Sequence, residues 1–295
     1  MVSVCVVNWR TTDETLAMAS TLAAGAGDLP WELIVADNDS GDGSVERLAA
    51  ELPEATVFGT GGNLGFGAGV NRAVERASGE WLFILNPDTR VHERAIQVLV
   101  EYLAEHPEAG VVGPRMIDGE GRRQPSARRF PTVGAALFRH TPLGRLFPAN
   151  RYAASYLMDD LSLDRPADVD WLSGSAMMFP RAAFDALGGF DEGFFMYCED
   201  IDICRRLWDA GRRVVHHPGA VVEHTIGAAS DKAQARMIRE HHLSMARYYR
   251  KHLRDRTPLL LRPLYPLGIG LRHALRQAHR RSLERKQARQ AKGRR

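Results

Sequence analysis

Apolar residues in the first 110 positions form short runs separated by polar, often glycine-rich turns. The run VSVCVVNW at 2–9 is rich in β-branched residues without polar alternation, which predicts a strand buried on both faces. Further strands are predicted within 31–44, 55–61 and 80–89, and helices over 11–25, 44–52, 63–78 and 92–106. This alternation of strand and helix predicts an α/β fold with a parallel sheet.

Polar clusters follow each predicted strand, at Asn8–Trp9, Asp37–Ser40, Asn63–Gly69 and Asn86–Asp88. In open parallel sheets, ligands bind beyond the carboxyl ends of the strands. We therefore expect these four clusters to contribute to one site.

The second half of the chain is less regular. Residues 115–170 combine Pro, Arg and scattered apolar residues, which favours a long irregular excursion. Residues 169–224 then predict a strand, a short helix, an acidic segment, a helix and a last strand.

The acidic segment FFMYCEDIDICRRL at 194–207 carries carboxylates directly after apolar and aromatic residues. In a helix beginning near Glu199, Asp200 would share a face with apolar residues and Asp202 would point away from it. Arg205 or Arg206 could pair with Asp202, which predicts an ordinary solvated helix charge. Glu199 and Asp200 remain as candidates for chemistry, because buried carboxylates are costly unless they are paired or used.

Composition and charge narrow the class of protein. The 295 residues are 44% hydrophobic and 25% charged, as in an ordinary globular protein. Three cysteines without framework spacing indicate reduced thiols and a cytosolic setting, and the start of the chain predicts no signal peptide. No stretch reaches 18 apolar residues, so no transmembrane segment is expected. The net charge of +3 divides into about +12 for residues 251–295 and −9 for the rest.

Several single motifs have both a functional and a structural interpretation. Asp88 in NPD ends an apolar strand, where it could bind a divalent cation or simply form a turn. His224 ends a later strand and becomes a metal candidate only if Asp88 lies opposite it. The glycine-rich segment 59–71 could bind phosphate or simply be a flexible helix entry. It fits neither G-x-G-x-x-G nor a P-loop, which argues against a nicotinamide-dependent enzyme. WLSGSA at 171–176 only superficially resembles a nucleophile elbow, which argues against a hydrolase.

Taken in order, the motifs VVNW, VADNDSGDGS, NLGFGAGVN, LFILNPDT, GGFDEGFFMYCEDIDICRRL and VVEHTIGAAS resemble glycosyltransferase family 2, in its bacterial rhamnosyltransferase branch, over residues 2–250. The resemblance implies the glycosyltransferase A-type fold, in which a Rossmann-like nucleotide half with a mainly parallel sheet is joined to an acceptor half. The expected divisions are a nucleotide-sugar-binding half at 1–114, an acceptor-binding and catalytic half at 115–250 and a basic, helical, amphipathic tail at 251–295.

The resemblance also implies roles for individual residues. Asp200 matches the general base, and Asp88 and His224 match ligands of Mg²⁺ or Mn²⁺. The expected donor-binding residues are Val7, Asn8, Trp9, Asp37, Asn38, Asn63, Gly65, Asn71 and Asn86. The expected acceptor-binding residues are Trp171, Gly174, Asp191, Glu192 and Glu199. Asn86 replaces the first Asp of the D-x-D motif that many relatives carry.

The implied reaction is an inverting transfer of L-rhamnose from dTDP-rhamnose to a polyprenyl-linked saccharide at the inner face of the cell membrane. One carboxylate suffices, because the nucleotide diphosphate is already a good leaving group. The alternatives are the same fold with another nucleotide sugar or a soluble acceptor, and a non-catalytic protein that binds nucleotide or nucleic acid.

The C-terminal tail has its own pattern. Apolar residues recur at helical spacing, while most basic side chains lie on the other side, which predicts a helix resting on an anionic membrane surface. The apolar set is Leu267, Leu271, Ala274, Leu275 and Ala278, and the opposing set is Arg272, Arg276, His279 and Arg280. Nucleic acid is not an expected partner, because the tail lacks interleaved aromatic residues.

Overall fold

A computed structural model describes residues 1–131, 158, 164–225, 234–263, 265–270, 272 and 277 of the chain. The chain divides into two units. Unit 1 comprises Met1–Phe195 and Glu199–Ala229, and unit 2 comprises Met196–Cys198 and Ser230–Arg295. The three residues that precede Glu199 therefore belong to the C-terminal unit.

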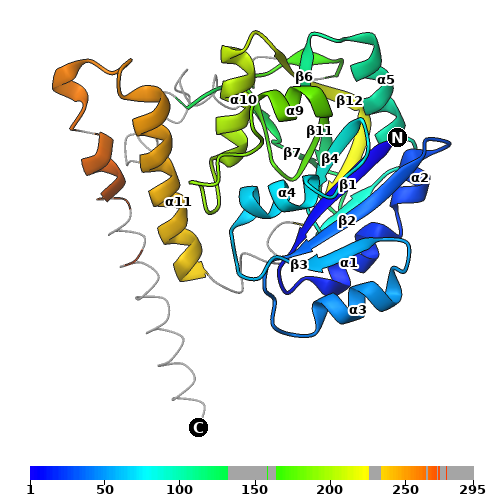
Figure 1. Cartoon of the computed structure of the whole chain (residues 1–295). Helices are drawn as coiled ribbons and strands as arrows, with labels where there is room; N and C mark the ends of the chain where they lie inside the picture. Colours follow the sequence, from blue (N-terminus) through cyan, green and yellow to red (C-terminus); the bar gives the residue numbers. More distant parts are fainter. Residues whose placement is uncertain are drawn as a thin grey trace. The chain divides into compact units, whose positions relative to one another are not determined.

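A mixed sheet in the order β3-β2-β1-β4-β11-β6-β12-β5 forms the centre of unit 1 (Figure 1). Its first four strands are parallel, as the runs of β-branched residues predicted. They are β1 (Val2–Asn8), β2 (Trp31–Asp37), β3 (Thr56–Gly59) and β4 (Trp81–Leu85). Their shared direction brings their carboxyl ends to one edge of the sheet.

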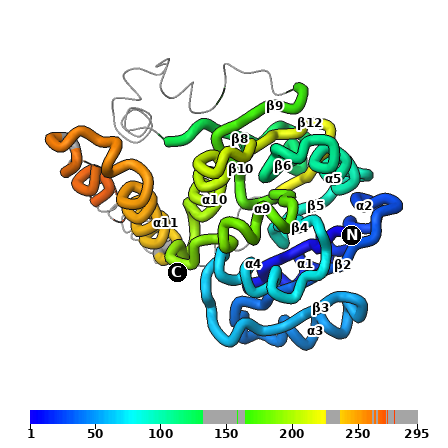
Figure 2. Tube along the Cα trace, turned by 45° about the horizontal axis from the view of Figure 1, so that its top comes forward, coloured from blue at the N-terminus to red at the C-terminus, as the bar shows by residue number. Residues whose placement is uncertain are grey.

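The second half of the sheet is mixed in direction. β11 runs antiparallel to β4, while β12 is parallel to β6 and antiparallel to β5. These strands are β5 (Thr89–Val91), β6 (Ala109–Ile117), β11 (Ala176–Pro180) and β12 (Arg213–His224), with short β7 (Arg123–Gln124) and β9 (Ala167–Asp168) at the side. A separate ribbon pairs β8 (Ala127–Arg128) with β10 (Trp171–Leu172), and β10 packs against α10 (Glu199–Asp209) (Figure 2).

Helices cover both faces of this sheet (Figure 1). One face carries α1 (Thr12–Ala19), α2 (Leu22–Ala26) and α5 (Ala95–Glu105), whose apolar residues join alternate residues of β1 in the main core. The other face carries α4 (Phe66–Val74), α9 (Arg181–Ala186) and α10. Helix α3 (Ser44–Glu51) packs beside α1 and β3.

Most of the strands and helices predicted in the first 110 residues are confirmed. The short strand β5 was not predicted. The helix predicted over 11–25 is two helices, because the chain turns at Ser20 and Thr21. The segment assigned to an irregular excursion contributes strands, and the predicted boundary at residue 114 lies inside β6. The division of unit 1 into donor and acceptor halves stays a prediction.

Unit 2 is built on helix α11 (Gln234–Tyr248), which continues as a π-helical turn (Tyr249–Leu253), followed by a loop and a short 3₁₀ helix (Leu259–Leu261). Residues 265–270 are again helical. Most of the predicted amphipathic tail lies outside the described residues. Within those residues, every helix is too short or too polar to cross a bilayer.

Candidate functional site

The carboxyl ends of β1 and β2 are joined by a buried polar network. Asn8 donates from Nδ2 to the Asp37 carboxylate at 2.6 Å, and Ser40 donates to it from its hydroxyl at 2.6 Å and its backbone N–H at 2.9 Å. The hydroxyls of Thr11 and Thr15 both donate to Asn8 Oδ1 at 3.0 Å. Hydrogen bonds therefore compensate the burial of Asp37 and fix its carboxylate at the rim of the sheet.

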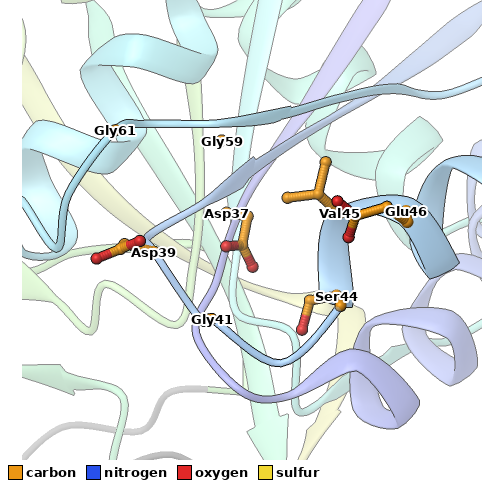
Figure 3. A pocket seen from close by; sticks show the side chains of 9 residues that line it. Asp37, Asp39, Gly41, Ser44, Val45, Glu46, Gly59 and Gly61 are labelled. Carbon is orange, nitrogen blue, oxygen red and sulfur yellow. The ribbon is translucent and has the colours of Figure 1, made fainter.

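A pocket of about 640 Å³ opens beside Asp37, between the loop after β2 and the end of β3. Figure 3 shows Asp37 at the centre of this group, with Asp39 on one side and Val45 on the other. Its remaining walls are Gly41, Gly43, Ser44, Glu46, Gly59 and Gly61. The volume is in the range of small-molecule sites. Asp37 and the cluster around it were expected at a ligand site from the sequence, whereas Ser44, Val45 and Glu46, at the start of α3, were not.

The predicted donor-binding residues of the glycine-rich loop lie together. Asn38 donates from Nδ2 to the Gly65 carbonyl at 2.8 Å, and Asn63 accepts from the Gly65 N–H at 3.2 Å. Gly65 has a positive φ of 89°, and a Cβ there would lie only 2.1 Å from the Phe195 carbonyl oxygen. Only glycine fits this approach, so the loop entering α4 is held against the segment that leads to the acidic motif.

Asn71 joins α4 to the same part of the chain. Its side-chain amide donates to the Phe190 carbonyl and accepts from the Phe190 N–H, both at 2.9 Å, and also donates to Glu192 at 3.1 Å. Asp191 caps its own turn by accepting the N–H of Gly193 at 2.9 Å. The side chain predicted to line the donor pocket thus holds the loop that carries Asp191 and Glu192.

The two remaining predicted residues of β1 and its turn have different surroundings. Val7 is buried beneath α4, where a Cβ on Gly69 would lie 3.0 Å from its methyl groups. Trp9 is half-buried, and the Arg10 guanidinium lies over its ring at 5.4 Å from the ring centroid. Of these two, Trp9 is the one with accessible surface for a ligand.

Asp200 is half-buried in the first turn of α10. Its carboxylate accepts hydrogen bonds from the N–H groups of Gly174 at 3.1 Å and Ile201 at 2.8 Å. Burial raises the pKa of Asp200, while these two donors and the charge of Arg128 oppose that rise. The carboxylate is therefore held in one orientation and is more basic than an exposed aspartate.

Glu199 has a different environment from its neighbour. Its side chain is only 6% exposed, and its Oε2 atom has no hydrogen-bond partner among the described residues. Burial raises the pKa of Glu199 well above its usual value, and the negative charge of Asp200 makes a smaller contribution in the same direction. The protonated form is therefore favoured at Glu199 compared with an exposed glutamate, and little of the side chain is accessible. Direct contact with an acceptor sugar, which the family resemblance implied, stays a prediction.

The interpretation of Asp202 as a solvated helix charge is wrong. Its side chain is fully buried and pairs with Arg206 at 2.8 Å. Arg206 also donates to the carbonyls of Leu187 at 2.9 Å and Gly189 at 2.8 Å. The prediction failed because helical spacing shows which residues can pair but not whether the pair is buried. In the structure the pair holds the turn before the Asp191 loop from inside the protein.

Sheet register brings Asp88 and His224 together. β12 pairs with β5 so that His224 lies opposite Thr89, the residue after Asp88. His224 Nε2 is 3.3 Å from Asp88 Oδ1, and both side chains are largely buried. From the sequence, His224 was a metal candidate only if Asp88 lay opposite it. In the structure the two residues do face each other.

Gln124 on β7 supports this pair and was not identified from the sequence. It donates from Nε2 to the His224 carbonyl at 2.7 Å, and its Oε1 lies 3.3 Å from His224 Nδ1. If His224 carries its proton on Nδ1, Gln124 accepts it and the Nε2 lone pair faces Asp88. This is the supporting contact that metal-bound histidines usually have.

The donor set fits a hard divalent cation. Carboxylate oxygen and imidazole nitrogen are suitable ligands, and two protein ligands leave positions for phosphate oxygens. Within the described residues there is no cluster of three or more His, Cys, Asp or Glu side chains that could enclose a metal. A cation at Asp88 and His224 would thus need further ligands from a substrate. Asn86, two residues earlier, is half-buried and pairs through its backbone with Ser175 at 3.0 Å.

The ribbon beside Asp200 contains the last predicted residues. Trp171 is buried, donates from Nε1 to the Arg129 carbonyl at 2.9 Å and has the Arg128 guanidinium 5.2 Å from its ring centroid. Gly174 lies against Asp200, where a Cβ would be 3.4 Å from the Asp200 Cβ. Arg128 was not identified as a site residue from the sequence.

The chain is similar in sequence to two rhamnosyltransferases and in fold to a mannosyltransferase. The chain is 35% identical over 231 residues to N-acetylglucosaminyl-diphospho-decaprenol L-rhamnosyltransferase of Mycobacterium tuberculosis, covering 74% of each chain. It is 27% identical to rhamnosyltransferase WbbL of Escherichia coli, covering 65% of this chain and 72% of the relative. Mannosyltransferase PcManGT from Pyrobaculum calidifontis, solved with GDP-Man and Mn²⁺, has the same fold, with a TM-score of 0.55 at 18% identity, covering 98% of this chain and 80% of that one.

The predicted A-type glycosyltransferase fold is therefore confirmed. Residues 1–242 match the sequence model described as "Glycosyltransferase like family 2". The protein is a glycosyltransferase, and it belongs to family 2.

Proposed function

We propose that the protein is an inverting transferase that moves L-rhamnose from dTDP-rhamnose to a polyprenyl-diphosphate-linked saccharide. The single observation that carries the mechanism is the Asp200 carboxylate, which two backbone N–H groups hold at the start of α10. The choice of sugar and acceptor is supported by the name of the mycobacterial relative and by the 35% identity to it.

In the proposed reaction, an acceptor hydroxyl oxygen attacks the anomeric carbon of the donor sugar. Asp200 takes the hydroxyl proton as the new C–O bond forms, and the bond to the diphosphate breaks, with its electron pair leaving on the diphosphate. Because burial raises the pKa of Asp200, its carboxylate is a stronger base than an exposed aspartate would be. Attack opposite the leaving group inverts the anomeric centre.

The rest of the site would bind and orient the donor. The pocket beside Asp37 would receive the nucleoside, and Asn38, Asn63 and Gly65 would shape the adjacent wall. Asp88 and His224 would hold Mg²⁺ or Mn²⁺, which would neutralise negative charge on the leaving diphosphate. Gln124 would keep the His224 ring in place.

The acceptor defines the location. A polyprenyl-linked substrate stays in the bilayer, so we place the protein at the cytoplasmic face of the cell membrane, attached through its basic C-terminal tail. The alternative is the same reaction with another nucleotide sugar or a soluble acceptor. It stays open because none of the contacts described above would distinguish one sugar from another by its hydroxyl groups.

A donor screen tests the proposal. Purified protein is incubated with polyprenyl-diphospho-GlcNAc and, in turn, with dTDP-rhamnose, UDP-GlcNAc, UDP-galactose and GDP-mannose, and product lipid is followed by mass spectrometry. We expect a product only, or fastest, with dTDP-rhamnose, and NMR should show an inverted anomeric configuration. A faster reaction with another donor, or retained configuration, would contradict the proposal.

A further inference from the structure

Three leucines in unit 2 face solvent to an unusual degree. Leu259, Leu260 and Leu267 are 75%, 89% and 67% exposed. Apart from Met1 at the N-terminus, the exposed large hydrophobic side chains of the described residues are these three and Leu243, all in the C-terminal unit. Single exposed leucines are common, but several in a short segment indicate an interaction surface.

The segment 257–265, which contains Leu259 and Leu260, is held by polar and aromatic contacts. The Thr257 hydroxyl donates to the Leu253 carbonyl at 2.7 Å, and Arg262 Nε donates to the Thr257 carbonyl at 3.1 Å. The Tyr249 hydroxyl donates to the Arg262 carbonyl at 3.2 Å, and its ring stacks on Tyr265 at 4.2 Å between centroids. Thr257 and Tyr249 are thus buried and hydrogen-bonded, while Leu259 and Leu260 are exposed.

Basic side chains accompany these leucines. Residues 234–263 contain eight Lys or Arg against two acidic residues. Exposed members of the set near this segment are Arg250, Lys251, Arg254 and Arg256. Apolar side chains with surrounding cations match an anionic bilayer, in which leucine enters the acyl region and the cations stay with the headgroups.

Two other occupants fit this surface less well. A second copy docking through the same surface would bring like charges together. Nucleic acid would need accessible aromatic rings for stacking, whereas Tyr248 and Tyr249 are buried.

We propose that Leu259, Leu260 and Leu267 insert into an anionic lipid surface and that these leucines, rather than basic charge alone, give the C-terminal unit its membrane affinity. This inference rests on the proposed function only in that a lipid-linked acceptor gives membrane contact a purpose. The same unit includes Met196–Cys198, where the Met196 carbonyl accepts the Ser244 hydroxyl of α11 at 2.8 Å. The lipid-contacting unit therefore also contains the residues that lead into Glu199 and α10.

The test is sedimentation of the full-length protein with vesicles of phosphatidylglycerol and phosphatidylcholine, or of phosphatidylcholine alone, at low and high salt. The double substitution Leu259→Gln/Leu260→Gln keeps the net charge and removes the apolar contact. We expect it to lower the partition coefficient at least about tenfold at both salt concentrations. The matched control Leu259→Met/Leu260→Met should bind like the wild type.

A charge variant separates the two contributions. Arg254→Gln/Arg256→Gln should weaken binding at low salt and have little effect at high salt, because salt screens the headgroup attraction. Unchanged binding of the Leu→Gln variant would overturn the proposal, as would a wild type that stays in the supernatant with anionic vesicles. A change of oligomeric state in the Leu→Gln variant without a loss of vesicle binding would assign the leucines to a second copy instead.

Transfer to a short-chain, water-soluble acceptor separates this inference from the proposed function. The Leu→Gln variant should transfer sugar to that acceptor at the wild-type rate while losing vesicle binding. If neither protein transfers sugar but the leucines govern binding, the proposed function fails and the membrane surface stands. If transfer is normal and binding does not depend on the leucines, the reverse holds.

Discussion

His224 Nε2 lies 3.3 Å from Asp88 Oδ1, because strand β12 pairs with β5 in a register that puts His224 opposite Thr89. Asp88 precedes β5 and His224 ends β12, and α5, β6 and α10 lie between them in the sequence. Only the assembled sheet therefore brings the two side chains together. Gln124 contacts the backbone and the ring of His224 from β7. The pair and its support together form the candidate cation site.

Loss of the Gln124 contacts should weaken metal binding. In Gln124→Leu the His224 ring loses its fixed orientation, and we expect the affinity for Mn²⁺ with nucleotide diphosphate to fall by about 10- to 100-fold. Electron paramagnetic resonance of free Mn²⁺ measures this without activity. Gln97→Leu on α5, which removes a surface contact with Glu101, is the matched control and should leave the affinity unchanged. Equal affinities in both variants would contradict the role of Gln124.

Removal of divalent cations should stop transfer. EDTA is expected to abolish product formation, and added Mg²⁺ or Mn²⁺ should restore it in the wild type. Asp88→Asn keeps the size of the side chain but loses its charge, so it should need a higher metal concentration for half-maximal rate. Full activity in EDTA would mean that side chains neutralise the diphosphate and would exclude this cation site.

Asp200→Asn should remove the proposed base while preserving its position, because an amide oxygen can still accept one of the two backbone hydrogen bonds. We expect kcat to fall by about 10²–10⁴-fold with nearly unchanged donor affinity. Asp209→Asn, an exposed change on the same helix, serves as the control. Near-normal turnover in the Asp200 variant would transfer the role to another group.

The pH profile of the wild type gives a second check on Asp200. Transfer needs the ionised carboxylate, so kcat/KM should rise with pH as Asp200 loses its proton. Since burial raises the pKa of Asp200, the acidic limb should lie above about 3.9, the usual value for aspartate. A limb at or below that value would show that the group is not buried in the working enzyme.

Glu199→Gln should stabilise the protein, increasingly so as the pH rises. The pKa of Glu199 is raised by burial and then by the charge of Asp200, so above about 4.3 the unfolded chain releases this proton while the folded chain keeps it. The wild type therefore loses stability from that pH up to the folded pKa, whereas the glutamine variant does not. Denaturant unfolding at pH 4 and pH 8 measures the difference, and a variant that is less stable than the wild type at pH 8 would contradict a raised pKa of Glu199.

Disruption of the buried Asp202–Arg206 pair should be costly. Asp202→Ala leaves Arg206 without its counter-charge, and we expect a loss of about 3–5 kcal/mol in the free energy of unfolding. Asp209→Ala breaks the more exposed pair with Arg205 on the same helix and should cost about 0–1 kcal/mol. Similar losses in both variants would argue against a special role for the buried pair.

The sequence by itself determined most of the strands and helices of the first half and the beginning of α10 at Glu199. Local periodicity is sufficient there, because β1, β2 and β4 are continuous apolar runs and α5 has one apolar face. It also identified Asp88 and His224 as possible partners on condition that they meet.

Tertiary structure decided what periodicity could not. The meeting of Asp88 and His224 depends on the register of β12, and the contribution of Gln124 depends on the pairing of β7 with β6. The burial of Asp202 depends on how α10 packs, since a helical pattern shows which residues share a face but not what covers that face. Long-range pairing and burial are properties of the assembled sheet, and no short stretch of this chain contains them.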